Sequence, residues 1–586
     1  MKSFKTIIFL FVLLISGVNG FAQESLTKDV RVQREYVPTV FDAMKINQMP
    51  EREDTIDFSP RFDYQLSVHP LSGIPEVSPL TAAAMARQRP RDLYSSYVRG
   101  GMGNYQLLFG DIFYNITRNE KFAFSIGLQQ ESSWGDLKLE NDRSVDAPYH
   151  NTNGGLYMRH FFDDKTLELD LDFHRLAYRY YGLQTIDPLE VYNVFLADGT
   201  SQDVVGANLI PDDQQRQTAF DLHFGLHGQQ SDLNDTRYHL NFDYGGFNNR
   251  TGVGENSFSL GGDLYIPFGA LSLKVDGAGI YRKANVPDEE GENPELFDFE
   301  EREQIFLMVN PRVVIPGNKL KVEVGLNLTG EFADSEEFYL SPHVRGDLTI
   351  AEGVVSTFLG MTGELHQNSY RDIMEENPFV SPDVLVKPSF TNIRGFAGVK
   401  GNFSSATSFT ARLDYEFIED EYFFVNRHFR ESASVDDWGM SNLFDVVYDD
   451  ATLLTLTGEF LIRPLQELDI ILKGVYYGWT LDNLDYAWHK PEMELGVRAA
   501  YAYNDEWRFD ASFNVIGERK AYDSSQTDDI KSLESVADFN LGANYQFNKR
   551  LHFFGRIQNI FASKFYPWAG YPMQGLNARV GAGYSF

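Results

Sequence analysis

The chain has 586 residues with 47 Phe, 31 Tyr and no Cys, and its 84 acidic residues outnumber 51 basic ones, for a net charge of −33. The excess of acid argues against a nucleic-acid partner, because such a protein must neutralise phosphates with clustered Lys and Arg. The absence of cysteine excludes disulfide frameworks, thiol catalysis, zinc–thiolate sites and a lipid anchor on a cysteine after a signal sequence. The abundance of aromatic residues argues against a disordered chain.

Residues 1–22 have the parts of an export signal. Two lysines precede an unbroken apolar run at residues 7–15, and Gly20 and Ala22 are the small residues expected before a cleavage site. The apolar run of nine residues is too short to cross a bilayer as a helix, which takes about 20. We therefore expect a cleaved signal peptide and an exported protein. Together with the strand pattern of the later residues, this signal leads us to expect the outer membrane of a Gram-negative cell.

Residues 23–92 are rich in proline and precede the first predicted strand. Prolines at this density interrupt strands and helices and favour extended chain. We expect a periplasmic extension that either enters the lumen of a barrel or docks a partner protein. The segment contains seven prolines, which are Pro38, Pro50, Pro60, Pro70, Pro75, Pro79 and Pro90.

From residue 93 to residue 586, apolar and polar residues alternate with a period of two, most clearly at 166–179, 319–332 and 538–547. This period predicts strands with one apolar and one polar face. In a membrane barrel the apolar face contacts lipid and the polar face lines the lumen, where it binds a solute or holds loops and extension in place. The residues predicted to face the lumen are Lys319, Lys321, Glu323, Asn327 and Glu331 in one segment and Glu168, Asp170, Asp172 and His174 in another.

Short turns and long connections alternate along this region, which is typical of an outer-membrane barrel. About 22 strands fit into residues 93–586, and about 20 or 24 are the alternatives because the hairpin near Gly103 and Asn104 is weakly marked. We expect one closed all-β sheet, since closure leaves no unpaired edge in lipid. The predicted turns are 117–120, 163–164, 316–318, 351–353, 464–467, 504–506 and 548–550, and the predicted polar connections are 133–150, 180–217, 284–302, 367–390, 421–450 and 517–533.

The last predicted strand ends on Phe586, with Tyr584 two positions earlier on the same face and with Arg579 and Gly581 before them. This pattern resembles the C-terminal targeting strand of outer-membrane barrels, in which a polar residue and a glycine precede two aromatic residues. The resemblance implies that the barrel assembly machinery is a partner and that the aromatic residues of the closing strand face outer-membrane lipid.

Segments at both ends resemble a known family. Residues 554–561 (FGRIQNIF) and 565–575 look like the tail of TonB-dependent receptors, and residues 34–47 together with 103–105 are similar to plugless receptor-like barrels of Bacteroidota. The resemblance implies an outer-membrane receptor or transport barrel of about 22 strands.

The chain departs from that family before its first strand. TonB-dependent receptors carry a globular plug domain inside the barrel, whereas only 70 residues, 23–92, separate the predicted signal from the predicted barrel here. A barrel left empty would leak, so we expect the extension, inward-folded long loops or a partner protein to occupy it.

No motif in the sequence indicates catalysis or a cofactor. The 12 His residues include no HExxH pair, and no nucleophile elbow accompanies the abundant Ser residues. The acidic stretch at 288–303 has no calcium-loop spacing, so we interpret it as a solvated loop. We expect neither enzyme activity, nor a cofactor, nor a bound metal ion.

Two functions remain. The first is an outer-membrane receptor or transport barrel for a polar solute, without a standard plug. The second is a structural barrel subunit of a cell-envelope complex, whose N-terminal extension docks periplasmic or outer-membrane partners. The family resemblance favours the first function, and the short N-terminal segment favours the second.

Overall fold

The structure is a computed structural model. It describes residues 94–586 apart from 117–118, 141, 143, 183–190, 196–200, 206–213, 229–235, 287–300, 334–335, 427–442 and 523–529. The predicted signal peptide, the predicted extension and most of the acidic stretch therefore lie outside the described residues.

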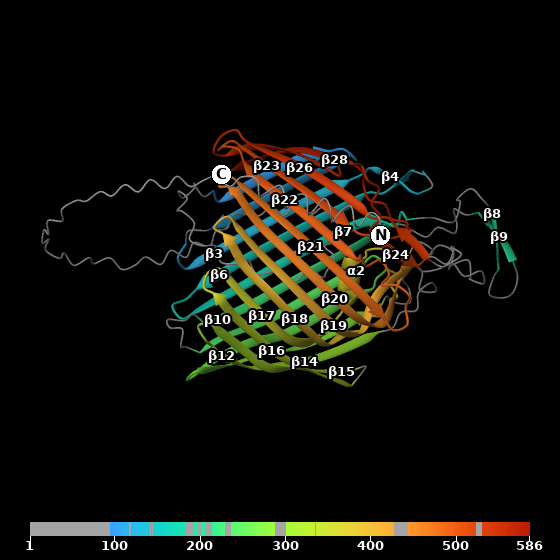
Figure 1. Ribbon diagram of the computed structural model, residues 1–586. Helices are drawn as coiled ribbons and strands as arrows, with labels where there is room; N and C mark the ends of the chain where they lie inside the picture. The colour runs from blue at the N-terminus through green and yellow to red at the C-terminus, as the bar shows by residue number, and fades with distance from the viewer. Residues whose placement is uncertain are drawn as a thin grey trace, which may run out of the picture. The chain divides into compact units, whose positions relative to one another are not determined.

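Twenty-two antiparallel strands form one closed barrel (Figure 1). Each strand of this sheet pairs with the next one along the chain, and β28 pairs back with β1. The prediction of 22 strands in a closed all-β sheet is confirmed, including the hairpin at Gly103. The strands are β1 (Ser96–Gly103), β2 (Leu108–Ile116), β3 (Phe122–Ser133), β6 (Tyr149–Phe161), β7 (Lys165–Arg179), β10 (Gln214–Gly228), β11 (Arg237–Asn249), β12 (Gly254–Phe268), β13 (Leu271–Asn285), β14 (Arg302–Ile315), β15 (Leu320–Ala333), β16 (Glu337–Ala351), β17 (Val355–His366), β18 (Ser389–Ser404), β19 (Thr407–Asn426), β20 (Phe444–Leu465), β21 (Leu468–Leu481), β22 (Met493–Ala502), β23 (Trp507–Ile516), β26 (Val536–Gln546), β27 (Leu551–Gln558) and β28 (Asn577–Ser585).

Smaller elements lie in the long connections at one end of the barrel, which we call the loop end. They are the hairpins β4 (Asp136–Lys138) with β5 (Ser144–Asp146), β8 (Val191–Phe195) with β9 (Ser201–Val205), and β24 (Arg519–Tyr522) with β25 (Ile530–Leu533), together with the helix α2 (Tyr370–Glu376). Figure 1 shows α2 toward this end. Within the described part of the chain, no helix has the length and apolar character needed to cross a membrane.

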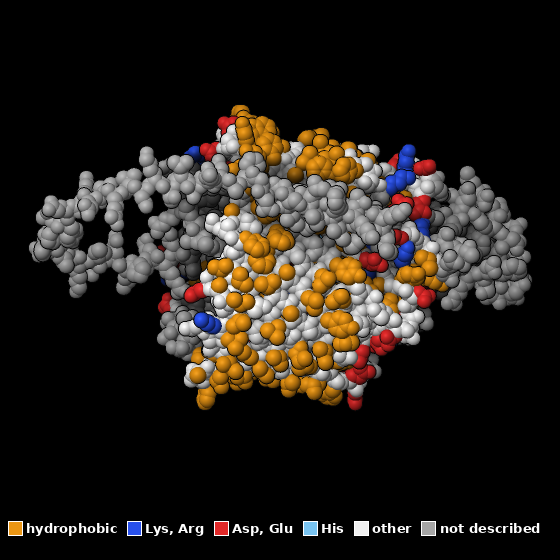
Figure 2. All heavy atoms as spheres, viewed as in Figure 1, with side chains coloured by type: hydrophobic (Ala, Val, Ile, Leu, Met, Phe, Trp, Pro, Cys, Tyr) orange, Lys and Arg blue, Asp and Glu red, His pale blue; other side chains and the backbone are white. Residues whose placement is uncertain are grey.

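The alternating apolar and polar residues of each strand lie on opposite faces of the barrel wall. In β15, Leu320 and Val324 are 50% and 45% exposed, whereas Glu331 on the opposite face is only 3% exposed. Figure 2 shows hydrophobic side chains over the outer surface of the barrel, with Asp, Glu, Lys and Arg gathered toward its two ends. An apolar exterior between charged rims is the surface that a barrel needs in a bilayer.

The barrel closes where β28 pairs with β1, in the register Val98↔Tyr584 and Gly101↔Gly581. A Cβ atom at Gly581 would lie 2.4 Å from the Phe554 ring and 2.6 Å from the Gly100 carbonyl oxygen. The absence of a side chain at Gly581 therefore leaves room for the Phe554 ring of the neighbouring strand β27.

Short turns join the strands at the other end, the turn end, as predicted. For example, β6 ends at Phe161 and β7 begins at Lys165, around the turn predicted at 163–164. The prediction of a polar connection over 421–450 is wrong at both of its ends. Cross-strand pairing continues through Tyr422↔Tyr448 and Phe424↔Val446, so β19 and β20 have 20 and 22 residues.

Candidate functional site

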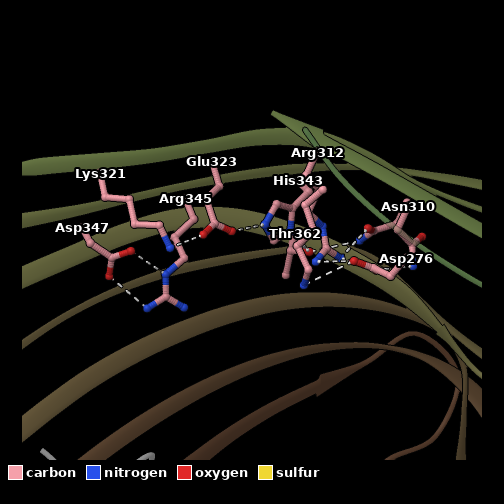
Figure 3. Close-up of polar contacts among 11 residues, drawn as sticks. Asp276, Asn310, Arg312, Lys321, Glu323, His343, Arg345, Asp347 and Thr362 are labelled. Atoms are coloured by element: carbon pink, nitrogen blue, oxygen red, sulfur yellow. Dashed lines mark hydrogen bonds and ion pairs between the residues drawn. The ribbon is translucent and has the colours of Figure 1, made fainter. Parts of the chain in front are cut away.

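Charged and polar side chains on the inner face of β13–β17 form a row of contacts (Figure 3). Near the turn end, Lys321 Nζ lies 2.6 Å from one carboxylate oxygen of Glu323, and His343 Nε2 lies 3.8 Å from the other. Arg345 donates two hydrogen bonds to Asp347, at 2.9 and 3.0 Å. This part of the wall therefore presents paired charges of both signs.

The row continues toward the middle of the wall. Arg312 lies 3.5 Å from Asp276 and donates a hydrogen bond of 3.2 Å to the side-chain oxygen of Asn327. The amide nitrogen of Asn327 in turn donates to the Gly363 carbonyl oxygen at 2.6 Å. Because Asp276, Arg312 and Asn327 are joined across β13, β14 and β15, this part of the row is a fixed polar surface.

A cavity of about 430 Å³ opens beside the turn-end part of this row. Lys321, Arg345 and Lys400 bring three positive charges to its lining, and Glu323 and Asp347 bring two negative ones. A site with both signs of charge can orient a polar solute by either of its charged groups.

A second polar group lies on β7, among the residues predicted to face the lumen. Glu168 contacts Arg159 at 2.5 Å and His227 at 2.9 Å through its two carboxylate oxygens. His174 lies 3.1 Å from the Asn151 side-chain oxygen. The same face carries Asp172 opposite Asp221 of β10 and Asp170, whose buried Oδ1 atom has no hydrogen-bond partner among the described residues.

The predicted set is not a single cluster. Strands β10–β14 separate the β7 group from the β15 group. Glu331 lies toward the loop end of β15, where it accepts hydrogen bonds from Gln304 at 3.4 Å and Tyr339 at 3.3 Å. Lys319 lies in the turn before β15 and not on the strand, because β15 begins at Leu320.

The connection between β17 and β18 folds inward and carries α2. The Ser369 hydroxyl accepts a hydrogen bond from the Asp372 backbone N–H at 3.0 Å, and the Asp372 carboxylate accepts one from the Ser369 N–H at 3.0 Å. This reciprocal cap satisfies two backbone donors and begins a helix of seven residues. Ile373 and Met374 of the helix are buried.

Contacts with distant strands hold α2 in place. Arg371 makes two contacts of 2.5 and 2.8 Å with Asp221 of β10, and Gln217 of the same strand donates to the Met374 carbonyl oxygen at 3.3 Å. β10 lies seven strands before β17 in the barrel wall, with β11–β16 between them. A loop rooted at β17 and β18 that is anchored to β10 must cross the bore.

Tyr370 extends the same attachment to β11 and β12. Its hydroxyl accepts a hydrogen bond of 2.9 Å from Asn249, and its backbone N–H donates one of 3.0 Å to Glu255. Both partners are buried, so these hydrogen bonds are shielded from water.

Aromatic residues from several loops pack around this inward segment. Phe379 stacks on Tyr571 of the β27–β28 connection with ring centroids 3.6 Å apart, and Phe444 at the start of β20 lies 6.1 Å from the same ring. We call the buried cluster the loop core. Its residues are Leu176, Tyr178, Tyr180, Ala219, Phe247, Val253, Tyr370, Ile373, Met374, Phe379, Val380, Val386, Phe424, Leu443, Phe444, Trp568 and Tyr571.

His489 of the β21–β22 connection joins the loop core as a neutral side chain. Its Nδ1 atom lies 2.9 Å from the Phe424 carbonyl oxygen, and its Nε2 atom accepts a hydrogen bond of 3.3 Å from the Ala569 N–H. One ring nitrogen donates and the other accepts, which is the pattern of an uncharged imidazole. Burial lowers the pKa of His489 to about 3.

Lys490 and Glu376 form an ion pair beside the loop core, with the Lys490 Nζ atom 3.3 Å from Glu376. The Tyr422 hydroxyl donates a hydrogen bond to the other oxygen of the same carboxylate. Burial alone would lower the pKa of Lys490, but the carboxylates of Glu376 and Glu421 raise it above its ordinary value. The ion pair therefore ties the end of α2 to the β21–β22 connection.

Inward-folded loops were one of three predicted occupants of the lumen, but this particular loop was not predicted. Residues 367–390 were predicted to be a polar connection, whereas the structure buries Ile373, Met374, Phe379 and Val380 within it. The spacing of Ser369 and Asp372 ahead of apolar residues was a usable signal for a capped helix.

The predicted targeting residues lie on two faces of β28. Arg579 is buried 3.1 Å from Glu131, and Gly581 lies on the same inner face, whereas Phe586 is 55% exposed and its ring lies 4.8 Å from that of Tyr584. Their role in targeting stays a prediction.

Among the described residues, no group of three or more His, Asp or Glu side chains has an arrangement that could hold a metal ion.

Solved structures share this barrel. The ferric-catecholate import receptor Fiu from E. coli K12 is 12% identical, with 85% of this chain and 82% of that chain covered and a TM-score of 0.59. The siderophore receptor PirA from Acinetobacter baumannii is 11% identical, with 85% and 81% covered and a TM-score of 0.60. The copper transporter OprC is 12% identical, with 85% and 84% covered and a TM-score of 0.59.

The chain matches no protein-family model. It also matches no curated protein sequence. Because the chain is only 11–12% identical to these three proteins, the likeness establishes the fold alone. The chain has the closed 22-strand barrel fold that these receptors and this transporter share. The fold implied by the resemblance of the chain ends is confirmed, while a Bacteroidota origin and the lack of a plug stay predictions.

Proposed function

We propose that the chain is an outer-membrane barrel for the uptake of a polar solute, with the inner wall as the solute path and the loop core as its closure. One observation carries the proposal, which is the row of paired charges from Lys321 to Asp276 inside a barrel whose exterior is apolar. A wall of fixed charges of both signs replaces the water around a polar solute. The fold shared with import receptors and a copper transporter supports the same function.

Liposome swelling tests this function. The full chain is reconstituted into liposomes and exposed to glucose, glutamate or lysine, beside a variant in which residues 369–386 are replaced by a short Gly/Ser linker. We expect the full chain to admit little of any solute and the variant to admit all three. A control variant shortens residues 134–148, which lie at the same end but outside the loop core, and it should behave like the full chain. If the folded loop variant admits no solute, the proposal fails.

The loop core also favours a second candidate. A barrel whose bore is crossed by a packed loop core can serve as a structural subunit of a cell-envelope complex, with residues 23–92 docking a periplasmic partner. This function predicts that another protein remains bound after mild solubilisation of native membranes and is lost when residues 23–92 are removed. A barrel that purifies alone contradicts it.

A further inference from the structure

Arginines gather on the outer face of the barrel at the loop end of β7 and β10. Arg175 lies two residues beyond Phe173, on the same face, and Phe173 is 38% exposed on the outside of the barrel. The strand register places Arg175 opposite Thr218 and Arg216 opposite Ala177. Arg175 and Arg216 are therefore diagonal neighbours on one face, within reach of a common ligand.

Two further arginines flank this pair. Arg179, the last residue of β7, contacts Asp146 at 3.1 Å, and Arg250 donates a hydrogen bond of 2.9 Å to the Gln214 carbonyl oxygen. We call Arg175, Arg179, Arg216 and Arg250 the arginine patch.

The two central members of the patch have no protein partner in the described part of the chain. Arg175 and Arg216 are exposed, and neither makes an ion pair or a hydrogen bond there through its side chain. Two neighbouring guanidinium groups repel each other. Since no carboxylate of a described residue pairs with either of them, their arrangement favours an anionic ligand.

A row of aromatic rings runs along the outer face just below the patch. The Phe220 and Tyr244 rings are 6.4 Å apart, those of Tyr244 and Phe258 are 5.0 Å apart, and those of Phe258 and Tyr281 are 6.4 Å apart. Phe220 pairs directly with Phe173, which is two residues before Arg175. Outward aromatic rings of a barrel mark the boundary between lipid tails and headgroups. The arginine patch therefore lies at the depth of the headgroups.

Acidic side chains dominate the exposed charges on the rest of the loop end, although Lys138 and Lys564 are also exposed there. Such acidic groups would repel an anion. They are Glu301, Glu303, Glu336, Glu337, Glu419, Asp420, Asp482 and Asp485.

We propose that the arginine patch binds the phosphate of a lipid headgroup in the leaflet at the loop end, with the lipid tails packed against the aromatic row. The planar guanidinium groups match the oxygen geometry of phosphate, and the aromatic rings below supply an apolar surface for the tails. This site does not depend on whether the barrel transports a solute.

Native mass spectrometry of the detergent-purified full chain tests the proposal. The probes are dihexanoyl phosphatidic acid, dihexanoyl phosphatidylcholine, which has the same tails and no net charge, and inorganic phosphate. The test variant is Arg175→Gln with Arg216→Gln. The matched control is Lys283→Gln with Lys387→Gln, which removes two charges at the same end that are paired with Glu303 at 3.2 Å and Asp420 at 3.6 Å.

We expect the wild-type chain to retain phosphatidic acid about tenfold more strongly than phosphatidylcholine, and the test variant to lose about tenfold of that binding. The control variant should bind like wild type, and Arg175→Lys with Arg216→Lys, which keeps the charge, should bind more than the glutamine variant. Heat-dependent mobility in SDS gels verifies that each barrel is folded.

Equal retention of the two lipids would overturn the proposal, and so would wild-type binding by the folded test variant. Displacement of phosphatidic acid by an equal concentration of inorganic phosphate would also overturn it, since it would show a site for free anions without a contribution from the lipid tails.

Discussion

Gly581 occupies the seam where the last strand meets the first, and a side chain there has no free space. The atoms that a Cβ would meet are the Phe554 ring at 2.4 Å and the backbone oxygen of Gly100 at 2.6 Å. A backbone neighbour cannot rotate away as a side chain can, so the two closing strands would have to separate.

We therefore expect Gly581→Ala to destabilise the barrel by about 1–3 kcal/mol. The measurement is the temperature at which the folded barrel loses its fast mobility in SDS gels. Gly555→Ala in the neighbouring strand is the matched control, because the nearest atom to its Cβ would be a Val580 methyl group at 3.9 Å. Equal melting temperatures for the two variants would contradict this view of the seam.

His489 gives the loop core a dependence on pH. Its pKa is about 3 in the folded chain against an ordinary value of 6.5, so the unfolded form binds a proton more readily. The contribution of neutral His489 to the free energy of unfolding is therefore fully present above about pH 6.5 and decreases as the pH drops toward 3. At pH 5 the free energy of unfolding is lower by about 2 kcal/mol. We expect the fluorescence of Trp568, whose ring lies 5.3 Å from His489, to change between pH 7 and pH 5.

The variant His489→Gln separates this effect from other titrations, because glutamine is neutral throughout the range. It should remove most of the change in fluorescence. A variant that keeps the pH dependence of the wild-type chain would show that His489 is not its source.

At the scale of elements, the Lys490–Glu376 ion pair attaches α2 to the β21–β22 connection. The side chains are 15% and 5% exposed, so removal of one partner leaves the other as an unpaired charge that is shielded from water. We expect Lys490→Met to destabilise the inward loop by about 3–5 kcal/mol, measured as faster amide hydrogen exchange over residues 370–380.

The double variant Lys490→Met with Glu376→Gln tests the cause. The glutamine has no charge to leave unpaired and can still accept the hydrogen bond from Tyr422. It should recover most of the protection against exchange. If the double variant exchanges as fast as Lys490→Met alone, the loss comes from packing of the lysine stem and not from the buried charge.

Single strands were predictable from the sequence because their period of two reports directly which residues face lipid. The segment predicted at 319–332 corresponds to β15 within one residue at each end. The extended ends of β19 and β20 were not predictable in this way, because Glu421, Asp449 and Asp450 look like loop residues while the backbone still pairs. The capped helix α2 was not predicted. Its apolar residues are buried by strands that are distant in the sequence, so the residues around the helix carry only a weak pattern.

For the whole molecule, the number of strands and the closure of the sheet were predicted from the alternating short turns and long loops and from the period of two within the strands. The structure confirms both. The sequence predicted that Lys321, Glu323 and Asn327 share the polar face of one strand, but it did not predict their partners. Arg312, His343 and Arg345 come from other strands, and only the register of the sheet brings them beside Asn327 and Glu323. The loop core could not be predicted, since its residues come from loops and strands that are far apart in the sequence.

The central claim is that a polar-walled barrel is closed at its loop end by the inward loop and the loop core. Single-channel conductance in planar bilayers tests it most directly, with the full chain, a chain lacking residues 23–92, and a chain in which residues 369–386 are replaced by a short linker. We predict a closed barrel for the first two and stable open channels for the third. Open channels in the chain lacking residues 23–92 alone, or a barrel that stays closed after the inward loop is replaced, would contradict the claim.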